Sequence, residues 1–340
     1  MMMERIQRQY SLNLLRDGSD RKERVEILDS YSVSPVISVV ITNYNRCEDL
    51  QAAIRSVKEQ GYPNVEIVVV DNASVDGSRS LLASAFPDVT VIALNRNVGM
   101  HGYSVGFQHC NGAFIFQMDN DSMMPDSNVL SEVVKRFKDG PTDLAVVATR
   151  VEEYNGDIST IDALRHLDER RGPINTGGFH AGGVGFRRSF LDEIGYYNPD
   201  VFLYGSELFL QMKFLAAGLS LFYYPEILVL HKSSGVARSP NGLYYEIRNR
   251  YWFMRHFATR AQQWRFLPGM IVHDCVYSAY SKAPVLFLRA LKDGLGFLPE
   301  SLGPAVRSTK VEFVRKVNEV GSHFDVWNLK GRLASRLGDK

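Results

Sequence analysis

The sequence predicts an α/β protein with a mixed, mainly parallel sheet, helices on both faces of that sheet, and a helical segment at the C-terminal end. Two observations lead to this fold class. Over residues 36–118, short apolar runs alternate with stretches of helical periodicity. From residue 244 onward, the apolar residues recur at mostly helical spacing.

The first part of the chain reads as four strands separated by three helices. The strands are expected at residues 36–42, 65–70, 89–94 and 113–118, and the helices at 48–59, 76–85 and 99–110. Strands that are apolar on both faces and joined by crossover helices are typical of a parallel sheet covered on both sides. Farther along, the pattern predicts strands at 145–149 and 219–224, helices at 188–194 and 207–217, and a glycine-rich turn at 182–185.

Three regions are expected in the chain of 340 residues. Residues 1–35 are polar and end in Ser34-Pro35, so they read as an N-terminal extension. Residues 36–240 are expected to form the α/β domain, and residues 241–340 a helical region. One α/β domain with an appended helical segment accounts for this length.

The composition narrows the class of protein. The net charge of +1 gives no electrostatic reason to expect long nucleic acid as a partner. The three cysteines are far apart, which suits a reducing compartment better than a zinc site or a disulfide framework. No apolar run approaches the ~20 residues of a spanning helix, and the charged N-terminus lacks the apolar core of a secretory signal. We therefore expect a cytoplasmic protein that is soluble or peripheral to a membrane.

Polar clusters follow each of the first four predicted strands. They are residues 43–46 (NYNR), 71–74 (DNAS), 95–97 (NRN) and 119–121 (DND). Loops after strands are often polar, so one cluster alone says little. In parallel sheets, however, ligands gather at the carboxyl ends of the strands, and four clusters at that edge indicate one site.

Asp119 and Asp121 flank Asn120 at the end of the fourth predicted strand. A hard cation that keeps several waters and bridges two phosphates needs only one or two protein carboxylates. This segment therefore predicts a site for Mg²⁺ or Mn²⁺. The alternative is a solvated acidic turn.

The order and spacing of several segments carry a family resemblance. VISVVITNYNR, VEIVVVDNASVDGS and NRNVGMHGYSVGFQHCNGAFIFQMDNDS resemble the nucleotide-binding half of the inverting family 2 glycosyltransferases, which have the GT-A (Rossmann-like) fold. HAGGVGFRRSFLDEIGYYNPDVFLYGSELFLQMKFLAAG is similar to the acceptor half of that family. The resemblance covers about residues 36–257 and divides the α/β domain into a nucleotide-sugar half, 36–125, and an acceptor half, 126–240.

The resemblance implies a nucleotide site for UDP or dTDP. Tyr44 would stack on the base beside Asn43, and Asp71 would accept a hydrogen bond from the pyrimidine N3–H. Arg46 and Asn97 would lie near the ribose and the phosphates, and Asp119 and Asn120 would also contact the nucleotide sugar. On the residues alone, Asp71 could equally be a helix N-cap.

The resemblance also assigns a general base, further metal and sugar contacts, and a class of acceptor. Glu207 would take the proton of the acceptor hydroxyl, although the family usually has Glu-Asp where this chain has Ser206-Glu207, and Phe209 replaces a further Asp. A structural alternative for Glu207 is a first-turn Glu favoured by the helix dipole. His231 would complete the metal shell, and Gly182 and Gly183 would belong to the acceptor and donor-sugar loop.

Residues 244–250 resemble rhamnosyltransferase-like members that build bacterial surface polysaccharide, so the acceptor is expected to be a saccharide or a lipid-linked sugar. The C-terminal third interleaves basic and aromatic residues, which fits either an anionic membrane surface or a helical cap. These residues are Arg255, Arg260, Arg265, Arg289 and Lys292, with Trp252, Phe253, Trp264, Phe266 and Phe287.

Two other classes of protein stay open at this point. A sugar nucleotidyltransferase shares the architecture and the metal carboxylates, but it usually has a glycine-rich phosphate loop after the first strand, where this chain has residues 43–46. A non-catalytic protein that binds sugar nucleotides would explain the missing Glu-Asp pair.

Overall fold

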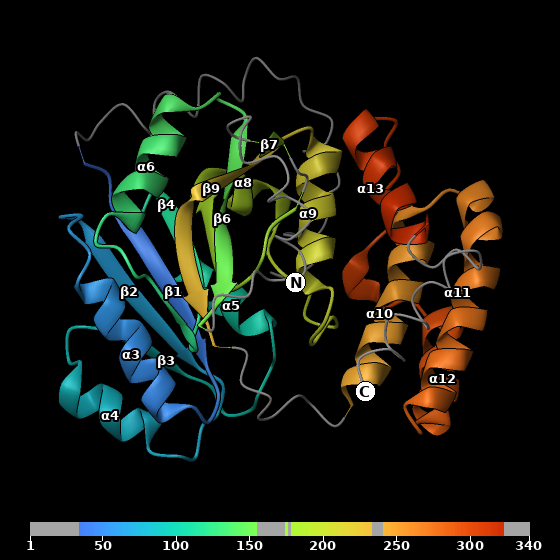
Figure 1. Ribbon diagram of the computed structural model, residues 1–340, viewed down its shortest axis with the longest axis horizontal. Coiled ribbons are helices and arrows are strands. Elements are labelled where there is room, and N and C mark those ends of the chain that lie inside the picture. Colours follow the sequence, from blue (N-terminus) through green and yellow to red (C-terminus); the bar gives the residue numbers. More distant parts are fainter. Residues whose placement is uncertain (1–33, 155–173, 176–177, 233–240, 323–340) are drawn as a thin grey trace. The chain divides into compact units, whose positions relative to one another are not determined.

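The computed structural model describes residues 34–154, 174–175, 178–232 and 241–322 (Figure 1). The chain divides into two compact units. The first comprises Met1–Tyr197 and Ala217–Ser234, and the second Asn198–Ala216 and Gly235–Lys340. Nearly all of the predicted N-terminal extension, residues 1–35, lies outside the described residues, as does the predicted domain boundary after residue 240. These regions therefore remain predictions.

The first unit is built on one sheet, which has nine strands among the described residues. Its strands are β1 (Ile37–Asn43), β2 (Val65–Asp71), β3 (Thr90–Ala93), β4 (Phe114–Asp119), β5 (Ser122–Met123), β6 (Leu144–Glu153), β7 (Ile174–Asn175), β8 (Gly183–Arg187) and β9 (Ser220–His231). They are ordered β3-β2-β1-β4-β8-β6-β9-β5, and β7 pairs with β9.

The three longest strand pairings are parallel, which confirms the predicted mixed, mainly parallel sheet. β1 pairs in parallel with β2 and β4, β2 with β3, and β6 with β9. The pairings of β8 with β4 and β6, and of β5 and β7 with β9, are antiparallel. β1 lies inside the sheet and is buried over most of its length, as its largely apolar sequence predicts.

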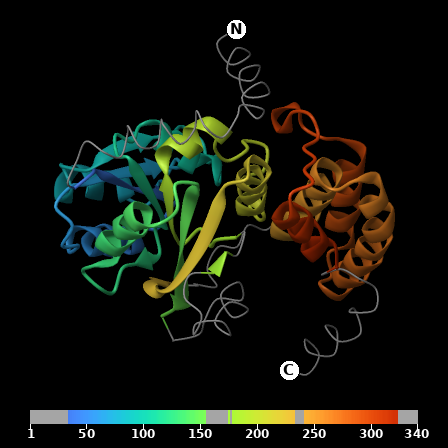
Figure 2. The ribbon, with the colours of Figure 1, turned by 90° about the horizontal axis from the view of Figure 1, so that it is seen from above.

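Helices cover both faces of this sheet (Figures 1 and 2). Apolar residues of α3 (Cys47–Lys58), α4 (Ser78–Ala85) and α6 (Val129–Asp139) share one core with alternate residues of β1, including Ile37, Val39 and Ile41. On the other face, α5 (His101–Gln108) packs so closely on β1 and β2 that a Cβ added to Gly106 would lie 2.5 Å from Val40 Cγ1. α8 (Arg188–Ile194) follows β8. The predicted two-sided covering is confirmed.

The predicted glycine-rich turn at residues 182–185 is wrong, because Gly183 to Gly185 lie in strand β8. The glycines are needed for close packing between elements. A Cβ on Gly183 would lie 2.7 Å from Val229 Cγ2 of β9, and one on Gly185 would lie 2.7 Å from Val133 Cγ1 of α6. Because real Cβ atoms do not approach so closely, these positions accept only glycine without a shift of the neighbours.

β6 extends well beyond the predicted strand at 145–149, and β9 joins the predicted strand at 219–224 to the apolar strand segment 226–230 that precedes His231. β9 continues through Pro225 to His231, and the pairing of β6 with β9 shifts register after Thr149 paired with Tyr224. Pro225 lies at this irregularity, where a missing backbone N–H is tolerated. The extension matters for function because it carries His231 to the far end of the strand.

The second unit is helical, which confirms the predicted C-terminal helical segment. Its elements are most of α9 (Ser206–Ala217), then α10 (Gly242–Phe257), α11 (Arg260–Tyr280), α12 (Pro284–Gly296), the short 3-10 helix η2 (Glu300–Leu302) and α13 (Val311–Ser322). α10 packs most extensively on α12, and a Cβ on Gly294 of α12 would lie 2.8 Å from Tyr251 Cβ. Among the described helices, none is long and apolar enough to cross a membrane.

Most aromatic residues of the C-terminal basic and aromatic stretch form the core of this second unit. Trp252, Phe253, Phe266 and Phe287 are buried, whereas Trp264 is 82% exposed. The helical-cap interpretation therefore accounts for the four buried aromatic residues. Trp264 needs a separate explanation.

Candidate active site

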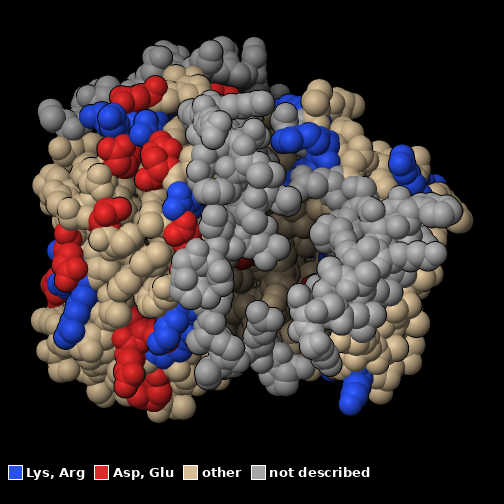
Figure 3. Space-filling model, in the orientation of Figure 1, with Lys and Arg blue, Asp and Glu red and all other residues tan. Residues whose placement is uncertain are grey.

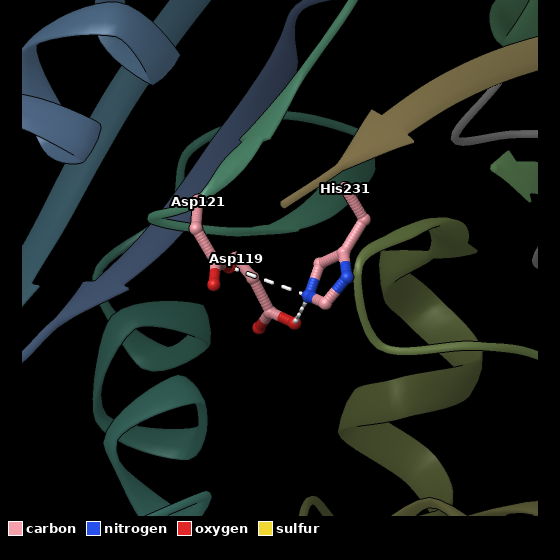
Figure 4. A group of neighbouring side chains, drawn as sticks. All are labelled: Asp119, Asp121 and His231. Carbon is pink, nitrogen blue, oxygen red and sulfur yellow. Dashed lines mark ion pairs between the residues drawn. The ribbon is translucent and has the colours of Figure 1, made fainter. Parts of the chain in front are cut away.

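Parallel pairing brings all four predicted polar clusters to one edge of the sheet, since Ala93 at the end of β3 is in register with Asp71. Asn43 is in register with Asp71, and Thr42 with Asp119, so the ends of β1, β2 and β4 lie side by side. The turn at 119–121 then leads into β5, where Ser122 pairs with His231 at the end of β9. This topology places the end of β9 beside the DND turn, as Figure 4 shows.

Asp119, Asp121 and His231 form a three-residue cluster whose ligand atoms all lie within 4.8 Å of one another. His231 Nε2 lies 3.3 Å from Asp121 Oδ1 and 3.8 Å from Asp119 Oδ2. The other ring nitrogen, Nδ1, lies 3.5 Å from Glu153 Oε1 of the neighbouring strand β6. Glu153 is therefore placed to orient the imidazole so that Nε2 faces the two aspartates.

The remaining carboxylate oxygens of the two aspartates have partners of their own. Tyr103, buried in α5, brings its hydroxyl to 2.5 Å from Asp119 Oδ1 and 3.0 Å from the carbonyl oxygen of Met118. Arg46 Nη1 lies 2.5 Å from Asp121 Oδ2. Each aspartate thus has one oxygen held by the protein and one that faces His231.

The electrostatics of the cluster favour a positive charge at its centre. Burial lowers the pKa of His231, but a hydrogen bond to Asp121 and the charges of Asp119, Asp121 and Glu153 outweigh this and raise it to about 9. Burial likewise opposes ionisation of Asp121, yet His231 and Arg46 lower the pKa of Asp121 overall. The raised pKa of His231 reflects the negative potential of the surrounding carboxylates, which is what a metal cation requires.

The donor set fits a divalent transition metal. Two carboxylate oxygens and one imidazole nitrogen converge, and imidazole suits Mn²⁺ better than Mg²⁺. Three protein ligands also leave positions for water or phosphate oxygens. Asp119, Asp121 and His231 are therefore the residues of the described chain that could hold such an ion.

Asn43 connects the metal cluster to the end of β2. Its side-chain oxygen accepts a hydrogen bond of 2.8 Å from Asn120 Nδ2, and its nitrogen donates to Asp71 Oδ1 at 3.3 Å and to Ser74 Oγ at 3.1 Å. Asn43 is almost fully buried. The network fixes the DND turn relative to the loop after β2.

Asp71 is fully buried, and neighbouring groups form hydrogen bonds to its carboxylate. Asp71 Oδ2 accepts hydrogen bonds from Arg79 Nε at 2.6 Å and from the backbone N–H of Ser74 at 3.1 Å. Arg79 also donates to the carbonyl oxygen of Leu94, while its side chain is 46% exposed. Asp71 is not the cap of α4, since Asp76 accepts from the Ser78 N–H there. A direct contact between Asp71 and a base would require one of these partners to move.

Tyr44 and Asn97 occupy loops at the same edge. Tyr44 directly follows β1 and is 47% exposed, so its ring is available for stacking. Asn97 Oδ1 accepts from the Gly99 N–H at 2.8 Å, in the loop before α5. Asn72, next to Asp71, accepts from the Val98 N–H at 3.2 Å and so ties that loop to the end of β2.

Gly182 lies next to residues that adjoin the metal cluster. A Cβ on Gly182 would lie 3.0 Å from His180 Nδ1 and 3.2 Å from Ser122 Oγ, and Ser122 is the residue after Asp121. The rings of His180 and His231 meet edge to face, with their centroids 5.6 Å apart. Gly183 is in register with Met118, the residue before Asp119, and its missing side chain leaves room for Val229 of β9.

Glu207 lies in the first turn of α9, within the second unit. The loop before it passes through two left-handed residues, Tyr204 (φ 61°) and Gly205 (φ 78°). α10 holds this loop, because Asn249 Nδ2 donates to the carbonyl oxygens of Leu203 at 2.7 Å and Tyr204 at 2.8 Å.

Phe209, which stands where the resembling family has a further Asp, is buried among aromatic rings of the second unit. Its ring meets those of Phe253 and Phe257 edge to face, at 6.0 Å and 5.5 Å. A carboxylate at this position would lose its hydration among these rings. The departure from the family pattern thus has a structural basis in this chain.

Several neighbours of the site were not predicted from the sequence. Tyr103, Glu153 and Arg79 each contact a predicted site residue, but they lie on helices or strands remote from it in the chain. Tyr103 is 16 residues from Asp119, and Glu153 is 78 residues from His231. Only Arg79 is near its partner in sequence, and nothing in its local pattern distinguishes it from a solvated helix residue.

Comparison with known proteins identifies the domain that carries this site. Residues 38–195 match the family model described as "Glycosyl transferase family 2". The chain therefore contains a glycosyltransferase family 2 domain. Asp119 and Asp121 lie within the matched residues, whereas Glu207 and His231 lie beyond them.

Curated relatives match parts of the chain. It is 32% identical over 130 residues to an uncharacterized glycosyltransferase of Nostoc sp., 33% over 102 residues to an undecaprenyl-phosphate 4-deoxy-4-formamido-L-arabinose transferase of Pseudomonas fluorescens, and 34% over 126 residues to the succinoglycan biosynthesis protein ExoO of Rhizobium meliloti. These matches cover 37%, 27% and 36% of this chain. They span 39%, 30% and 35% of the relatives, so about a third of each relative is represented.

The fold of a solved structure is similar to that of this chain over nearly the whole length of both chains. The mannosyltransferase PcManGT of Pyrobaculum calidifontis, in complex with GDP-Man and Mn²⁺, aligns over 98% of this chain and 97% of its own, with a TM-score of 0.54 and 18% identity. This likeness confirms the predicted GT-A fold.

Proposed function

We propose that this protein transfers a sugar, most simply a hexose, from a nucleoside diphosphate sugar to an acceptor hydroxyl with inversion. The observation that carries the proposal is the convergence of Asp119, Asp121 and His231 at the carboxyl edge of a family 2 domain. A site that moves a glycosyl group from a diphosphate must balance the negative charge of the leaving group. This cluster is suited to do so.

The proposed metal is Mn²⁺, with Mg²⁺ as the alternative. When bound, such an ion would neutralise the departing diphosphate as a Lewis acid. Asp119 and Asp121 would each offer one oxygen, and His231 would offer Nε2 while Glu153 lies beside Nδ1. Arg46, which lies beside Asp121 Oδ2, is close enough to the cluster to add a second positive charge near the phosphates. The Mn²⁺ in the similar mannosyltransferase structure supports this choice.

The proposed donor carries UDP or dTDP. Tyr44 has an exposed ring for stacking, and the network of Asn43, Asn120 and Asp71 supplies polar atoms at the same edge. Asp71 as an acceptor for a pyrimidine N3–H would favour uracil or thymine over cytosine. Because Asp71 is buried against Arg79, this proposal requires Arg79 or Asn43 to shift when the base binds.

Glu207 is the proposed general base. In an inverting transfer, the acceptor hydroxyl loses its proton as its oxygen attacks the anomeric carbon opposite the leaving diphosphate. The first turn of α9 gives Glu207 a fixed backbone position, held by the hydrogen bonds that Asn249 makes to the preceding loop. Gly182 and Gly183 would belong to the loop that contacts the donor sugar and the acceptor.

The proposed acceptor is a growing saccharide or a lipid-linked sugar in the synthesis of a polysaccharide, on the cytoplasmic side of a membrane. The relatives named for succinoglycan biosynthesis and for transfer to undecaprenyl phosphate support this class of acceptor. A lipid-linked acceptor would also make peripheral contact with the membrane useful.

A donor screen tests the proposal. The purified chain is incubated with a panel of UDP-, dTDP- and GDP-sugars in Mn²⁺, and release of the nucleoside diphosphate is measured with and without saccharide acceptors. We expect release from a UDP- or dTDP-sugar, faster with acceptor present. Calorimetric titration should show tighter binding of UDP or dTDP than of GDP. Tighter binding of GDP would overturn the base assignment, and no release from any donor would argue for a non-catalytic binding protein.

A further inference from the structure

The outward side of α11 lacks the polar residues that a solvated helix normally carries. Among the residues of α11 that are exposed, the only charged ones are Arg260 and Arg265, both at its N-terminal end. The others, which we call the α11 face, are Ala261, Trp264, Pro268, Val272, Cys275, Val276, Ala279 and Tyr280. From residue 266 to residue 280 no exposed side chain of α11 carries a charge.

The exposed apolar side chains of the α11 face are unusually large, and they are clustered on one helix. Trp264 is 82% exposed, Val272 47% and Tyr280 45%. A surface helix typically directs one apolar stripe to the core and charged residues to water, whereas α11 is apolar on its outer side as well. Contiguous apolar patches of this kind generally mark a surface that binds a partner or a membrane.

The apolar surface continues into α12, directly after the turn at residues 281–283. Val285 is 75% exposed and Leu288 61%, both in the first two turns of α12. The exposed residues later in α12 include Arg289 and Lys292. Exposed apolar residues thus continue across the join of α11 and α12, where Lys282 is the one exposed basic residue, and Arg289 and Lys292 follow in α12.

The exposed charges of this hairpin have one sign. Residues 260–296 contain two acidic residues, and neither is exposed. Asp274 is fully buried and lies 2.6 Å from Arg250 Nη2, and Asp293 is partly buried and accepts a hydrogen bond of 2.7 Å from the Tyr244 hydroxyl. The five basic residues, Arg260, Arg265, Lys282, Arg289 and Lys292, are all exposed. In Figure 3, the part of the right-hand surface that is not grey is mostly tan, with scattered blue patches.

We propose that the α11 face docks on an anionic lipid bilayer, with α11 lying in the membrane interface. An amphipathic element binds such a surface by burying apolar side chains at the level of the headgroups while Lys and Arg contact anionic lipids. α11, with 21 residues, is about 31 Å long and can lie flat along the surface. The proposed function includes a peripheral membrane contact, and the α11 face is the surface that we assign to this contact. In this respect the inference rests on the proposed function.

The charge pattern favours lipid over a second copy of the chain. A two-fold symmetric dimer through the α11 face would bring the same basic residues of both copies together. Like charges across an interface oppose association, whereas anionic headgroups complement them. An anionic bilayer satisfies the apolar side chains and the basic residues at the same time.

Cys275 provides a reporter inside the α11 face. It is exposed, whereas Cys110 is buried and its burial raises the thiol pKa to about 12, which makes it unreactive. In a full-length Cys47→Ser protein, a polarity-sensitive maleimide dye is attached to Cys275. The labelled protein is titrated with vesicles of phosphatidylcholine alone and with vesicles of equal parts phosphatidylcholine and phosphatidylglycerol.

We expect the dye emission to rise and shift to the blue with the phosphatidylglycerol vesicles, and to change much less with vesicles of phosphatidylcholine alone. The change should reverse partly in roughly 1 M salt, where charges are screened within ~3 Å. The variant Trp264→Ser/Val272→Ser/Val276→Ser should weaken partitioning at least about tenfold. Val75→Ser, at an 88% exposed valine of the first unit, is the matched control and should partition normally.

Three results would overturn the assignment. They are an unchanged emission with both kinds of vesicle, equal partitioning of the serine variant, and a blue shift that grows with protein concentration in the absence of vesicles, which would identify a second copy as the partner. UDP binding with Mn²⁺ is measured on the same samples. Loss of vesicle binding with normal UDP binding contradicts the α11 assignment alone, whereas absence of UDP binding contradicts the proposed function.

Discussion

Glu207 illustrates how one carboxylate at a helix start can serve either catalysis or stability. If it removes the acceptor proton, Glu207→Gln keeps the size and the hydrogen bonding of the side chain but loses its basicity. We then expect turnover to fall by at least ~10²-fold while UDP binding stays nearly unchanged. The measurement is steady-state transfer beside a calorimetric titration with UDP.

The alternative role of Glu207 predicts a different pattern. A carboxylate that only complements the helix dipole would cost ~0.3 to 1 kcal/mol of stability when neutralised, with catalysis largely spared. A Gln variant with normal turnover and a lower melting temperature would remove Glu207 from the mechanism. Asp200 would then be the next acidic candidate in the segment.

His256 gives the second unit a predictable dependence on pH. Burial, together with the positive charges of Arg307 and Lys213, lowers its pKa from 6.5 to about 4. As pH falls below 6.5, the unfolded chain takes up a proton at this residue before the folded chain does, so stability is lost between pH 6.5 and about 4. The loss attributable to His256 is on the order of 3 kcal/mol.

Urea unfolding at pH 7 and pH 4.5 measures this effect. His256→Phe keeps a ring beside Phe257, whose centroid lies 4.5 Å from that of His256, and should reduce the loss of stability on acidification. His109→Phe, at an exposed histidine of the first unit, should leave the loss as it is. The same pH dependence in wild type and His256→Phe would show that other groups dominate acid unfolding.

At the scale of single residues, the sequence predicts those site residues that are neighbours in the chain. Asp119 and Asp121 are separated by one residue at the end of an apolar run, so their pairing can be inferred locally. Tyr103 and Glu153 reach the cluster through packing and strand pairing, which no local pattern reveals. The burial of Asp71 behind Arg79 likewise depends on three-dimensional contacts.

At the scale of elements, α10 is the structural support of the loop that precedes Glu207. Asn249 is buried and donates to two backbone carbonyl oxygens of that loop, and Arg248 Nη2 donates to a third, that of Asp200, at 2.9 Å. An unpaired buried carbonyl costs about 1 to 3 kcal/mol, so the loop is expected to change conformation when its donors are removed. Asn249 is therefore a candidate positioning residue for Glu207.

We expect Asn249→Ala to lower kcat by roughly tenfold to a hundredfold, because a misplaced catalytic group costs about that much. UDP binding should stay near the wild-type value. Met254→Ala, at a buried residue of the same helix that makes none of these hydrogen bonds, serves as a control for lost stability. If both variants lose stability and turnover to the same extent, the effect of Asn249 is general destabilisation.

The boundaries of helices and strands could be predicted where the apolar periodicity is regular. They were missed where contacts between elements determine the local structure. The alternation over residues 36–118 gives β1 to β4 and the helices between them, although only β1, β4 and the end of β2 are buried on both faces and β3 is largely exposed. Residues 182–185 look like a turn by composition, but their glycines serve close contacts inside β8. α6 was not predicted, although Val129, Leu130, Val133, Val134 and Phe137 recur at helical spacing and are buried.

At the scale of the whole molecule, the sequence predicts the α/β domain and the helical region but not the two compact units. Residues 198–216 belong to the second unit although they lie between elements of the first. Such an excursion cannot be inferred from periodicity, which describes each element without its tertiary partners. Glu207 and Phe209 both lie in this excursion, and Phe209 is accounted for by the aromatic core that it joins.

The central claim is that Asp119, Asp121 and His231 hold a divalent cation on which sugar transfer depends. Asp121→Ala removes one oxygen of the cluster and should lower Mn²⁺-dependent transfer by at least ~10²-fold while the circular dichroism spectrum stays that of a folded protein. Asp126→Ala, at an exposed aspartate five residues farther along the chain, is the matched control and should transfer normally.

The most direct measurement is the initial rate of sugar transfer by wild type, Asp121→Ala and Asp126→Ala, each in Mn²⁺ and in EDTA. We predict that wild type and Asp126→Ala are active in Mn²⁺ and inactive in EDTA, and that Asp121→Ala is inactive in both. Transfer at full rate in EDTA, or by Asp121→Ala in Mn²⁺, would contradict the metal-dependent account.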